Sequence, residues 1–191
     1  MAVHPSGKFL YVEGDDRLFA FRIEANGALT PINSVSTGPD PEGVFVNPVL
    51  GFVHVMGDNR AASSHPIDPA SGAVGPASAA NSVDAFSVRS TAIDATGRLA
   101  YVADLQNVSM RVYTIDSTNG EMKLKGTAPT GPYPISAAIS PSGRFVYATN
   151  SQNDTVSAFR VNAETGLLST LGLPVPAGDR PFSITIATLI H

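Results

Sequence analysis

The sequence predicts an all-β protein, a β-propeller built from four four-stranded blades, because one short phrase recurs along the chain. The phrase "SPSGRFVYATN" fills residues 140–150, and related phrases begin at His4, Asn47 and Asp94. The copies follow one another at about 46 residues, which is a spacing typical of β-propeller blades. No segment carries a sustained apolar period of the helical kind, so we expect almost no helix.

Each repeat indicates four short strands in a fixed order. A short apolar segment such as "ISAAI" forms the innermost strand, and the recurring phrase supplies a turn followed by the second strand. The third strand carries an aromatic residue, and its shared position predicts that Phe21, Tyr113 and Phe159 are equivalent and buried. A glycine turn such as "ETGLL" leads into the fourth strand, and a Gly-Pro loop such as "TGPYPIS" closes the repeat.

The repeats divide the chain into four approximate blades and a closing strand. These segments are residues 1–43, 44–90, 91–136, 137–182 and 183–191. The innermost strand recurs once more than the other three, so the chain starts and ends on inner strands. This pattern predicts a single propeller domain or a partial propeller. If the ring stays open, its terminal blades expose apolar faces, and we expect self-association through the open blade edges.

Composition excludes several classes of function. The 12 basic residues are scattered through a chain of net charge −4, which argues against nucleic-acid binding. There is no cysteine, which excludes disulfides and thiolate chemistry. No apolar stretch is long enough to span a bilayer and no signal peptide is visible, so we expect no membrane contact and a cytoplasmic location. An extracellular or periplasmic location stays open, and neither a cofactor nor a metal is expected.

Candidate site residues gather on one face of the predicted disc. In a propeller, the loops after the second and fourth strands of every blade surround the mouth of the central channel. Polar side chains there suit a sugar or another polar small molecule, and a carboxylate could act as a general base. The alternative is that aspartate and asparagine at strand ends bind their own turns. The base candidates are Asp15, Asp58 and Glu42, and the ligand-binding candidates are Arg180, Asp40, Asp104, Tyr133 and Asn150.

Arg180 is the strongest single candidate for binding an anionic ligand. It is the only basic residue in the series of Gly-Pro loops. Its guanidinium group matches a carboxylate or a phosphate in shape and charge. The alternative is a salt bridge to Asp179 or to another aspartate at the rim.

Two histidines occupy aromatic positions of the repeat. His54 stands where another copy has Tyr101, and His65 stands where that copy has Tyr113. The register therefore predicts structural roles for both imidazoles. The alternative is that neighbouring strands bring them close enough to share a metal.

The last repeat resembles the blade pattern of a known enzyme family. Its sequence "GPYPISAAISPSGRFVYATNSQNDTVSAFRVNAETGLLSTLG" is similar to blades of the lactonase-type seven-bladed propellers, which include bacterial 6-phosphogluconolactonase and fungal carboxymuconate-cyclising enzymes. The resemblance implies that the chain is the C-terminal part of a seven-bladed propeller. It also implies hydrolysis of a sugar lactone such as 6-phosphogluconolactone by the full-length form. The alternative is a non-catalytic propeller of the surface-layer repeat type, which binds a ligand or a protein.

The sequence departs from the family pattern at the positions that the resemblance marks as functional. Enzymes of the family carry Pro-Arg-His in one Gly-Pro loop and a glutamate after a following strand. No repeat of this chain has the arginine and histidine together, so we expect the chain alone not to hydrolyse the lactone. The Arg-His positions hold Glu42-Gly43, Phe86-Ser87, Ile135-Ser136 and Phe182-Ser183, and the glutamate position holds Asp15, Asp58, Leu105 and Ser151.

Overall fold

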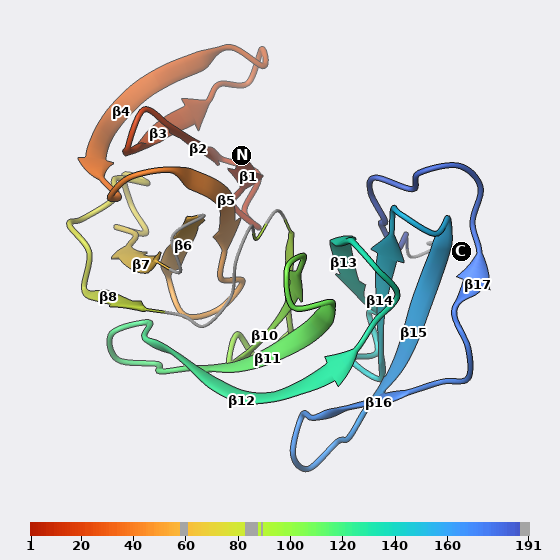
Figure 1. Ribbon diagram of the computed structural model, residues 1–191. Coiled ribbons are helices and arrows are strands. Elements are labelled where there is room, and N and C mark those ends of the chain that lie inside the picture. Colours follow the sequence, from red (N-terminus) through yellow and green to blue (C-terminus); the bar gives the residue numbers. More distant parts are fainter. Residues whose placement is uncertain (58–60, 83–87, 89, 188–191) are drawn as a thin grey trace. The chain divides into compact units, whose positions relative to one another are not determined.

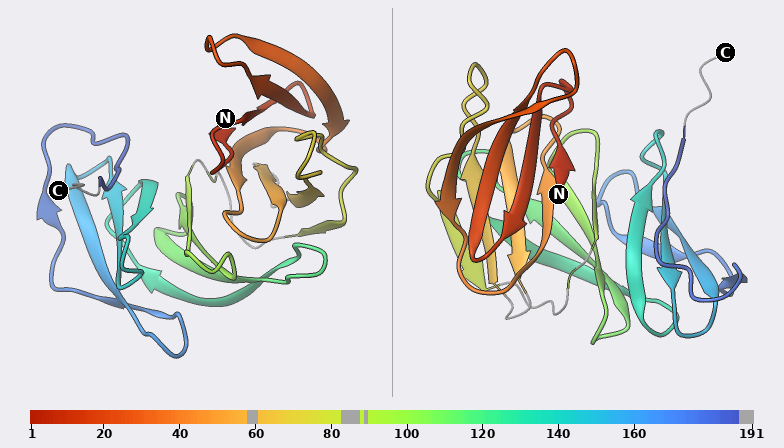
Figure 2. Two further views of the ribbon diagram at one scale, coloured as in Figure 1. Left: turned by 180° about the vertical axis from the view of Figure 1, so that it is seen from behind. Right: turned by 90° about the horizontal axis from the view of Figure 1, so that it is seen from above.

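The fold is the all-β architecture that the repeats predict. The computed structural model describes residues 1–57, 61–82, 88 and 90–187 (Figure 1), and none of these residues is helical. The described strands form four antiparallel sheets, and within each sheet the four main strands are neighbours in sequence order. Figure 2 shows this succession of strands in each sheet from two further sides. Each sheet corresponds to one predicted blade. No described helix is long and apolar enough to cross a membrane.

The first two sheets comprise blades 1 and 2. Blade 1 contains β1 (Ala2–Val3), β2 (Phe9–Gly14), β3 (Arg17–Ile23) and β4 (Leu29–Ser36). Blade 2 contains β5 (Pro41–Val46), β6 (Phe52–Gly57), β7 (Ala61–Pro66) and β8 (Ala79–Ser82).

The other two sheets comprise blades 3 and 4. Blade 3 contains β9 (Thr91–Ile93), β10 (Leu99–Asp104), β11 (Ser109–Ile115) and β12 (Met122–Pro129). Blade 4 contains β13 (Pro134–Ile139), β14 (Phe145–Asn150), β15 (Thr155–Val161), β16 (Leu168–Thr170) and β17 (Val175–Pro176).

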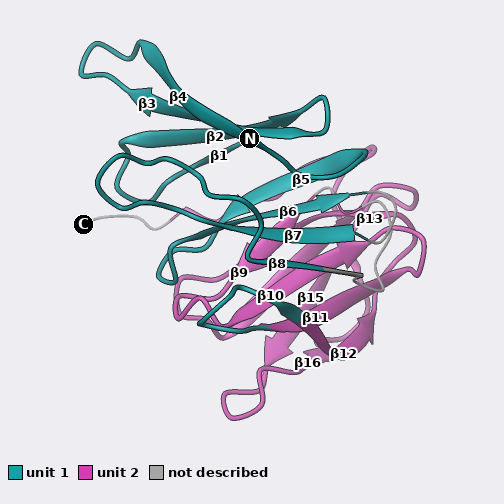
Figure 3. Cartoon of the chain, turned by 90° about the vertical axis from the view of Figure 1, so that its left-hand side faces the viewer, with its two compact units in different colours: residues 1–84, 115–122 teal, residues 85–114, 123–191 magenta. Residues whose placement is uncertain are grey.

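The chain divides into two compact units, which Figure 3 shows in different colours. Unit 1 consists of Met1–Asp84 with Ile115–Met122, and unit 2 consists of Ala85–Thr114 with Lys123–His191. Blades 1 and 2 lie in unit 1 and blade 4 lies in unit 2.

The recurring phrase is a hairpin between the innermost strand and the second strand of each blade. Its glycine has a left-handed backbone, with φ of 71° at Gly7, 70° at Gly51, 73° at Gly97 and 69° at Gly143. An L-residue rarely adopts this conformation, whereas glycine adopts it at little cost. The turn therefore explains why a glycine recurs at this point of every repeat.

The register confirms the predicted equivalence of the aromatic positions. Leu10 pairs with Phe21 in blade 1, just as Val146 pairs with Phe159 in blade 4. Tyr113 holds the same place opposite Ala100 in blade 3. Tyr113 and Phe159 are fully buried as expected, but Phe21 is only half-buried. The prediction was wrong on that point because Phe21 lies on the face of blade 1 that is outside the buried cluster of unit 1.

Packing between blades follows the same pattern in both units. We call the sheet face that bears Tyr11 in blade 1 and Tyr101 in blade 3 the forward face, and the opposite face the rear face. In unit 1 the forward face of blade 1 packs on the rear face of blade 2, around Tyr11 and Val53. In unit 2 the forward face of blade 3 packs on the rear face of blade 4, around Tyr101 and Val146.

A buried hydrogen bond crosses each of these two junctions. The Tyr11 hydroxyl donates to the carbonyl of Gly72 at 3.1 Å, and the Tyr101 hydroxyl donates to the carbonyl of Gly166 at 3.1 Å. Both glycines lie in the turn between the third and fourth strands of the next blade. Burial raises the pKa of each tyrosine to about 12, so both stay neutral donors at ordinary pH. We call this bond the tyrosine–glycine contact.

Two elements near the C-terminus differ from the simple repeat. The fourth strand of blade 4 is split, because β16 and β17 both pair with β15 on either side of residues 171–174. The segment 183–187, part of the predicted closing strand, has no assigned strand, although the Ile184 N–H donates to Ser136 Oγ at 3.2 Å. The remainder of that predicted strand, 188–191, lies outside the described residues.

Candidate functional site

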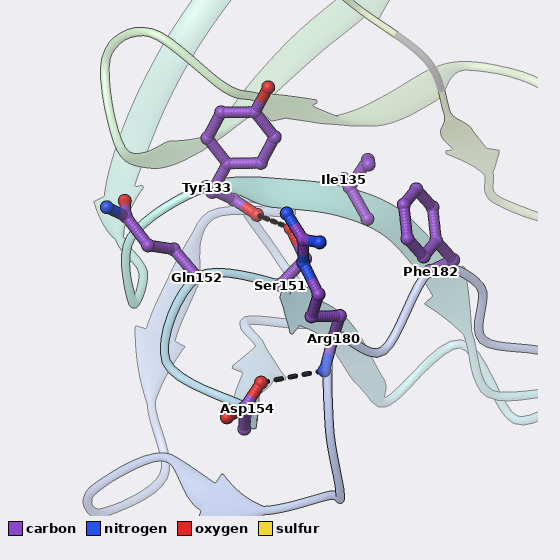
Figure 4. Close-up of a pocket in the computed structure, with 7 residues that line it drawn as sticks. All are labelled: Tyr133, Ile135, Ser151, Gln152, Asp154, Arg180 and Phe182. Carbon is purple, nitrogen blue, oxygen red and sulfur yellow. Dashed lines mark hydrogen bonds between the residues drawn. The ribbon is translucent and has the colours of Figure 1, made fainter.

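A pocket lies where the loops before and after blade 4 meet the loop that follows β14. Its volume is about 550 Å³, which is within the range of small-molecule sites. All of its lining belongs to unit 2. Figure 4 shows the lining residues Tyr133, Ile135, Ser151, Gln152, Asp154, Arg180 and Phe182.

Three of the lining residues have a left-handed backbone, which is uncommon for residues other than glycine. The φ angles are 60° at Tyr133, 57° at Asp154 and 48° at Arg180. Such conformations carry strain and tend to cluster at functional sites, where surrounding contacts hold them. Here the Arg180 N–H donates to Asp154 Oδ1 at 2.7 Å, and this bond ties the two loops together.

The pocket combines a buried floor with exposed walls. Ile135 and Ser151 are buried, and both the N–H and the hydroxyl of Ser151 lie against the Tyr133 carbonyl, at 3.0 and 3.4 Å. Tyr133 is 44% exposed and Phe182 is 65% exposed, so their rings are accessible to a ligand. These residues offer a flat apolar surface, a hydroxyl group and a cation in one place.

The guanidinium group of Arg180 is available for a ligand. In Figure 4 it points toward Tyr133 and Ser151, whereas the carboxylate of Asp154 is turned to the backbone N–H of Arg180. Within the described part of the chain, no ion pair of Arg180 with Asp179 or any other carboxylate is present. An unpaired guanidinium beside aromatic rings suits the carboxylate, phosphate or carbonyl oxygen of a sugar derivative.

The structure brings two of the predicted ligand-binding residues together, Arg180 and Tyr133. Asp104 and Asn150 are fully buried and do not line this pocket. Asp104 forms an ion pair with Arg111 and accepts hydrogen bonds from Asn107.

Asn150 is likewise bound to its own hairpin. Its side-chain amide donates to Ser157 Oγ at 2.9 Å and to Thr155 Oγ1 at 3.0 Å. These partners correspond to the alternative in which strand-end residues bind their own turns.

The remaining candidates belong to unit 1 and line none of the described pockets. Asp15 and Asp40 are exposed with left-handed backbones, and Glu42 is half-buried. The Asp40 N–H donates to Asp16 Oδ1 at 3.2 Å, which repeats the bond between Arg180 and Asp154. Asp58 lies outside the described residues. Over the residues that the structure covers, no cluster of three metal-ligating side chains occurs.

Both histidines have structural partners in blade 2. His54 Nδ1 lies 2.8 Å from Ser64 Oγ, and the Ser64 hydroxyl donates to the carbonyl of Gly120 at 2.8 Å. His65 lies 3.1 Å from the Gly75 carbonyl through Nδ1 and 2.9 Å from Ser63 Oγ through Nε2. Burial lowers the pKa of both side chains, that of His54 to about 3. They are thus neutral core residues at ordinary pH.

Two members of the pocket, Gln152 and Asp154, were not among the candidates from the sequence, and Asp154 is the one that forms a described hydrogen bond within the pocket. The sequence does contain a feature that could have identified Asp154, because Asp16 and Asp154 both immediately precede the third strand of a blade. Each lies opposite the residue that precedes a proline in the Gly-Pro loop, Asp40 or Arg180. Ile135 and Phe182 were noted only as occupants of the Arg-His positions, and here they line the pocket.

Comparison with known proteins identifies a family pattern in the second half of the chain. The model of the family described as "Lactonase, 7-bladed beta-propeller" matches residues 85–184. A search of curated proteins found no match.

Several solved structures share the fold. A periplasmic gluconolactonase from Pseudomonas aeruginosa is 23% identical with a TM-score of 0.75, and the match covers 93% of this chain and 57% of that one. A protein from Bacteroides fragilis, provisionally described as a 6-phosphogluconolactonase, is 18% identical with a TM-score of 0.78, covering 95% and 55%. A protein from Lactobacillus plantarum is 17% identical with a TM-score of 0.78, covering 91% and 56%. The present chain thus spans little more than half the length of these propellers.

Proposed function

The chain belongs to the family of lactonases with a seven-bladed β-propeller, and from this premise we propose that it forms the carbohydrate-binding part of a lactonase-type propeller. The full-length form would hydrolyse a sugar lactone such as 6-phosphogluconolactone. The observation that carries this proposal is the unpaired guanidinium of Arg180 in a pocket with two accessible aromatic rings.

The pocket residues fit the separate parts of such a ligand. A carboxylate or phosphate oxygen would accept hydrogen bonds from Arg180, a charge-assisted interaction of the stronger kind. The apolar face of the sugar ring would pack on Tyr133 or Phe182, and its hydroxyl groups would bond to Ser151 and Gln152. This arrangement predicts preference for a sugar acid or a phosphorylated sugar over a neutral sugar.

Hydrolysis of a lactone requires more than this binding surface. Water attacks the lactone carbonyl carbon, the ring C–O bond breaks, and a base removes the proton of the water while the leaving oxygen takes up a proton. Asp154 is the only carboxylate in the pocket lining, and one of its oxygens already accepts the Arg180 N–H. We therefore propose that the general base of the full-length form is a residue outside this pocket.

The second candidate function is a propeller that binds a ligand or protein without catalysis. The observation that favours it is the residue pair Ile135-Ser136 and the pair Phe182-Ser183 at the positions where the family's enzymes carry arginine and histidine. Ile135 and Phe182 line the pocket, and neither pair can supply a proton-transferring imidazole.

Calorimetric titration of the whole chain with 6-phosphogluconate tests the binding proposal. We expect Arg180→Ala to weaken binding by about tenfold or more, because a hydrogen bond to a charged group contributes roughly 1.5–3 kcal/mol. Arg22→Ala is the matched control, since Arg22 is an exposed arginine on β3 of unit 1, and it should leave the affinity unchanged. A pH-stat assay with the lactone should show hydrolysis no faster than background.

The two candidate functions give different results in these assays. Absence of binding by the unmodified chain, with an intact fold, would contradict the lactonase proposal and favour a protein-binding propeller. Turnover that disappears in Arg180→Ala would instead show that this pocket itself is catalytic, against our expectation.

A further inference from the structure

Two hydrogen bonds hold the stretch of chain that carries Arg180 and Phe182 of the pocket. At its start the Arg180 N–H donates to Asp154 Oδ1 at 2.7 Å, and at its end the Ile184 N–H donates to Ser136 Oγ at 3.2 Å. Phe182 lies midway in the sequence between these two donors. Both pocket residues are therefore close to a point at which the backbone is tied to blade 4.

The hydrogen bond of Ser136 repeats a contact found one blade earlier, where the Ala137 N–H donates to Ser90 Oγ at 3.1 Å. Ser90 and Ser136 hold the same position, because each stands two residues before the alanine that pairs with the tyrosine of the second strand. Ala137 and Ile184 also correspond, since each directly follows a serine of its own innermost segment. The contact between Ser136 and Ile184 is thus a feature of the repeat, because it also occurs where the next blade is complete.

Ser136 is a well-fixed acceptor for this bond. It lies in β13, paired with Thr149 of β14, and it is only 7% exposed. Its hydroxyl also lies 3.4 Å from Ser90 Oγ, which is too long for a strong hydrogen bond. The residue before it, Ile135, lines the pocket. Ser136 therefore ties the end of the stretch to a rigid strand at the floor of the pocket.

The two hydrogen bonds bear on different parts of the pocket. In the view of Figure 4, the guanidinium group of Arg180 points toward Tyr133, and the ring of Phe182 lies on the side of Ile135. Arg180 suits an anionic group, whereas the flat apolar ring of Phe182 suits the face of a closed sugar ring. The first bond thus bears on the cation, and the second bears on the aromatic ring.

We propose that Ser136 is a positioning residue that holds Phe182 for contact with the closed ring of a sugar derivative. This role rests on the proposed function of the pocket. A segment that is already ordered loses less conformational entropy when a ligand binds, so an anchored Phe182 favours a ligand that packs on its ring. An open-chain sugar acid has no flat ring. Ser136 therefore contributes to binding of the cyclic form of the ligand and not to binding of the open-chain acid that lactone hydrolysis produces.

Calorimetric titration of the whole chain with two sugar phosphates tests this role. Glucose 6-phosphate contains a closed ring, whereas 6-phosphogluconate carries its phosphate on an open chain. We expect Ser136→Ala to weaken binding of glucose 6-phosphate by about three- to tenfold, the effect of losing roughly one neutral hydrogen bond. Its affinity for 6-phosphogluconate should change by less than about twofold. General damage to the pocket would instead weaken both ligands alike.

Ser90→Ala is the matched control, because it removes the equivalent hydrogen bond to Ala137 and leaves the bond to Ile184 in place. It should leave both affinities unchanged. Amide hydrogen exchange, measured by NMR without ligand, tests the anchor itself. The Ile184 amide should exchange about tenfold faster in Ser136→Ala, while the Arg180 amide exchanges as in the unmodified chain.

The outcomes separate this role from the proposed function of the pocket. If the unmodified chain, with an intact fold, bound neither sugar phosphate, both proposals would fall. If it bound them and Ser136→Ala weakened neither ligand or both equally, only the role of Ser136 would be overturned. An unchanged exchange rate of the Ile184 amide in Ser136→Ala would also overturn that role, whether or not a ligand binds.

Discussion

Both units contain the same hydrogen bond between an aspartate that precedes the third strand of a blade and the backbone N–H of a residue in a Gly-Pro loop. The units differ in the side chain of the residue that donates this N–H. Asp154 Oδ1 accepts the N–H of Arg180 in unit 2, and Asp16 Oδ1 accepts the N–H of Asp40 in unit 1. All four residues have positive φ. The hydrogen bond therefore holds the donating residue in a left-handed conformation. This residue carries a guanidinium group in unit 2 and a carboxylate in unit 1.

This comparison predicts that Asp154 is a positioning residue for Arg180. In Asp154→Ala the loop loses a hydrogen bond to a carboxylate, worth roughly 1.5–3 kcal/mol, so we expect weaker binding of 6-phosphogluconate as well as lower stability. Asp16→Ala removes the equivalent bond in unit 1 and is the matched control, with lower stability and unchanged binding. Titration calorimetry and urea denaturation measure the two effects. Equal affinity of both variants for the ligand would contradict the positioning role.

The sequence could predict part of this site and not the rest. Arg180 and Tyr133 follow from the repeat, because the residue before proline in each Gly-Pro loop has a fixed place. Asp104 and Asn150 have a fixed place too, but strand alternation sets their side chains on the rear face. Asn150, for example, shares a side of β14 with Ala148, which is buried. Asp154 shares its place before the third strand with Asp16, but that place alone does not reveal its role, which depends on a hydrogen bond to the Arg180 N–H in another loop.

At the scale of elements, blade 2 differs in its tyrosine–glycine contact, because two residues take the place of the tyrosine. His54 stands at the tyrosine position, and Ser64 carries the hydrogen bond on to the Gly120 carbonyl. Because Ser64 gives its one hydrogen to that carbonyl, the Nδ1–H of His54 must donate to Ser64. The Nε2 atom is then an unprotonated acceptor, and it is buried without a hydrogen-bond partner among the described residues.

The buried imidazole of His54 at the tyrosine position predicts that blade 2 loses stability at acidic pH. Burial, with a smaller contribution from His65, lowers the pKa of His54 to about 3, below the value of 6.5 expected in the unfolded chain. The unfolded state therefore binds the proton first, and stability is lost as the pH falls from 6.5 toward 3. One such group costs about 2 kcal/mol between pH 6.5 and 4.5.

The double variant His54→Tyr with Ser64→Ala isolates this effect. It copies the pair Tyr11 and Ala20 of blade 1, in which tyrosine bonds directly to the glycine carbonyl. We expect its free energy of unfolding to fall less steeply below pH 6.5 than that of the unmodified chain, because no buried imidazole remains at this position. Urea denaturation at several pH values measures the difference. Parallel pH profiles of the two proteins would contradict the assignment.

The order of strands within each blade was accessible to sequence reasoning, because each repeat restates it. The ends of the elements were not. The innermost strands β5 and β13 begin at Pro41 and Pro134, a few residues before the predicted boundaries, since the strand starts directly at the end of the Gly-Pro loop. The split of the last strand follows from residues 171–174, where Gly172 has a positive φ that a continuous strand cannot contain.

At the scale of the whole molecule, the two buried clusters described above each belong to a single unit. Leu18 is fully buried in the cluster of unit 1, and Phe159 is fully buried in the cluster of unit 2. In repeat architectures, stability is approximately a sum of the stabilities of the repeats and of the contacts between neighbours. Damage to one cluster should therefore first affect the blades that share it.

Two substitutions, each of which leaves a cavity in one of the two clusters, test whether the stability of the blades is local. Phe159→Ala should cost about 3–5 kcal/mol and Leu18→Ala about 2–5 kcal/mol, because each leaves a cavity in a packed cluster. Hydrogen exchange followed by mass spectrometry should show loss of protection in β10, β14 and β15 for Phe159→Ala, and in β2, β3 and β6 for Leu18→Ala. Each variant thus serves as the control for the other. Equal loss of protection throughout the chain in both variants would mean that it unfolds as one cooperative unit, since a cavity then lowers the stability of every strand alike.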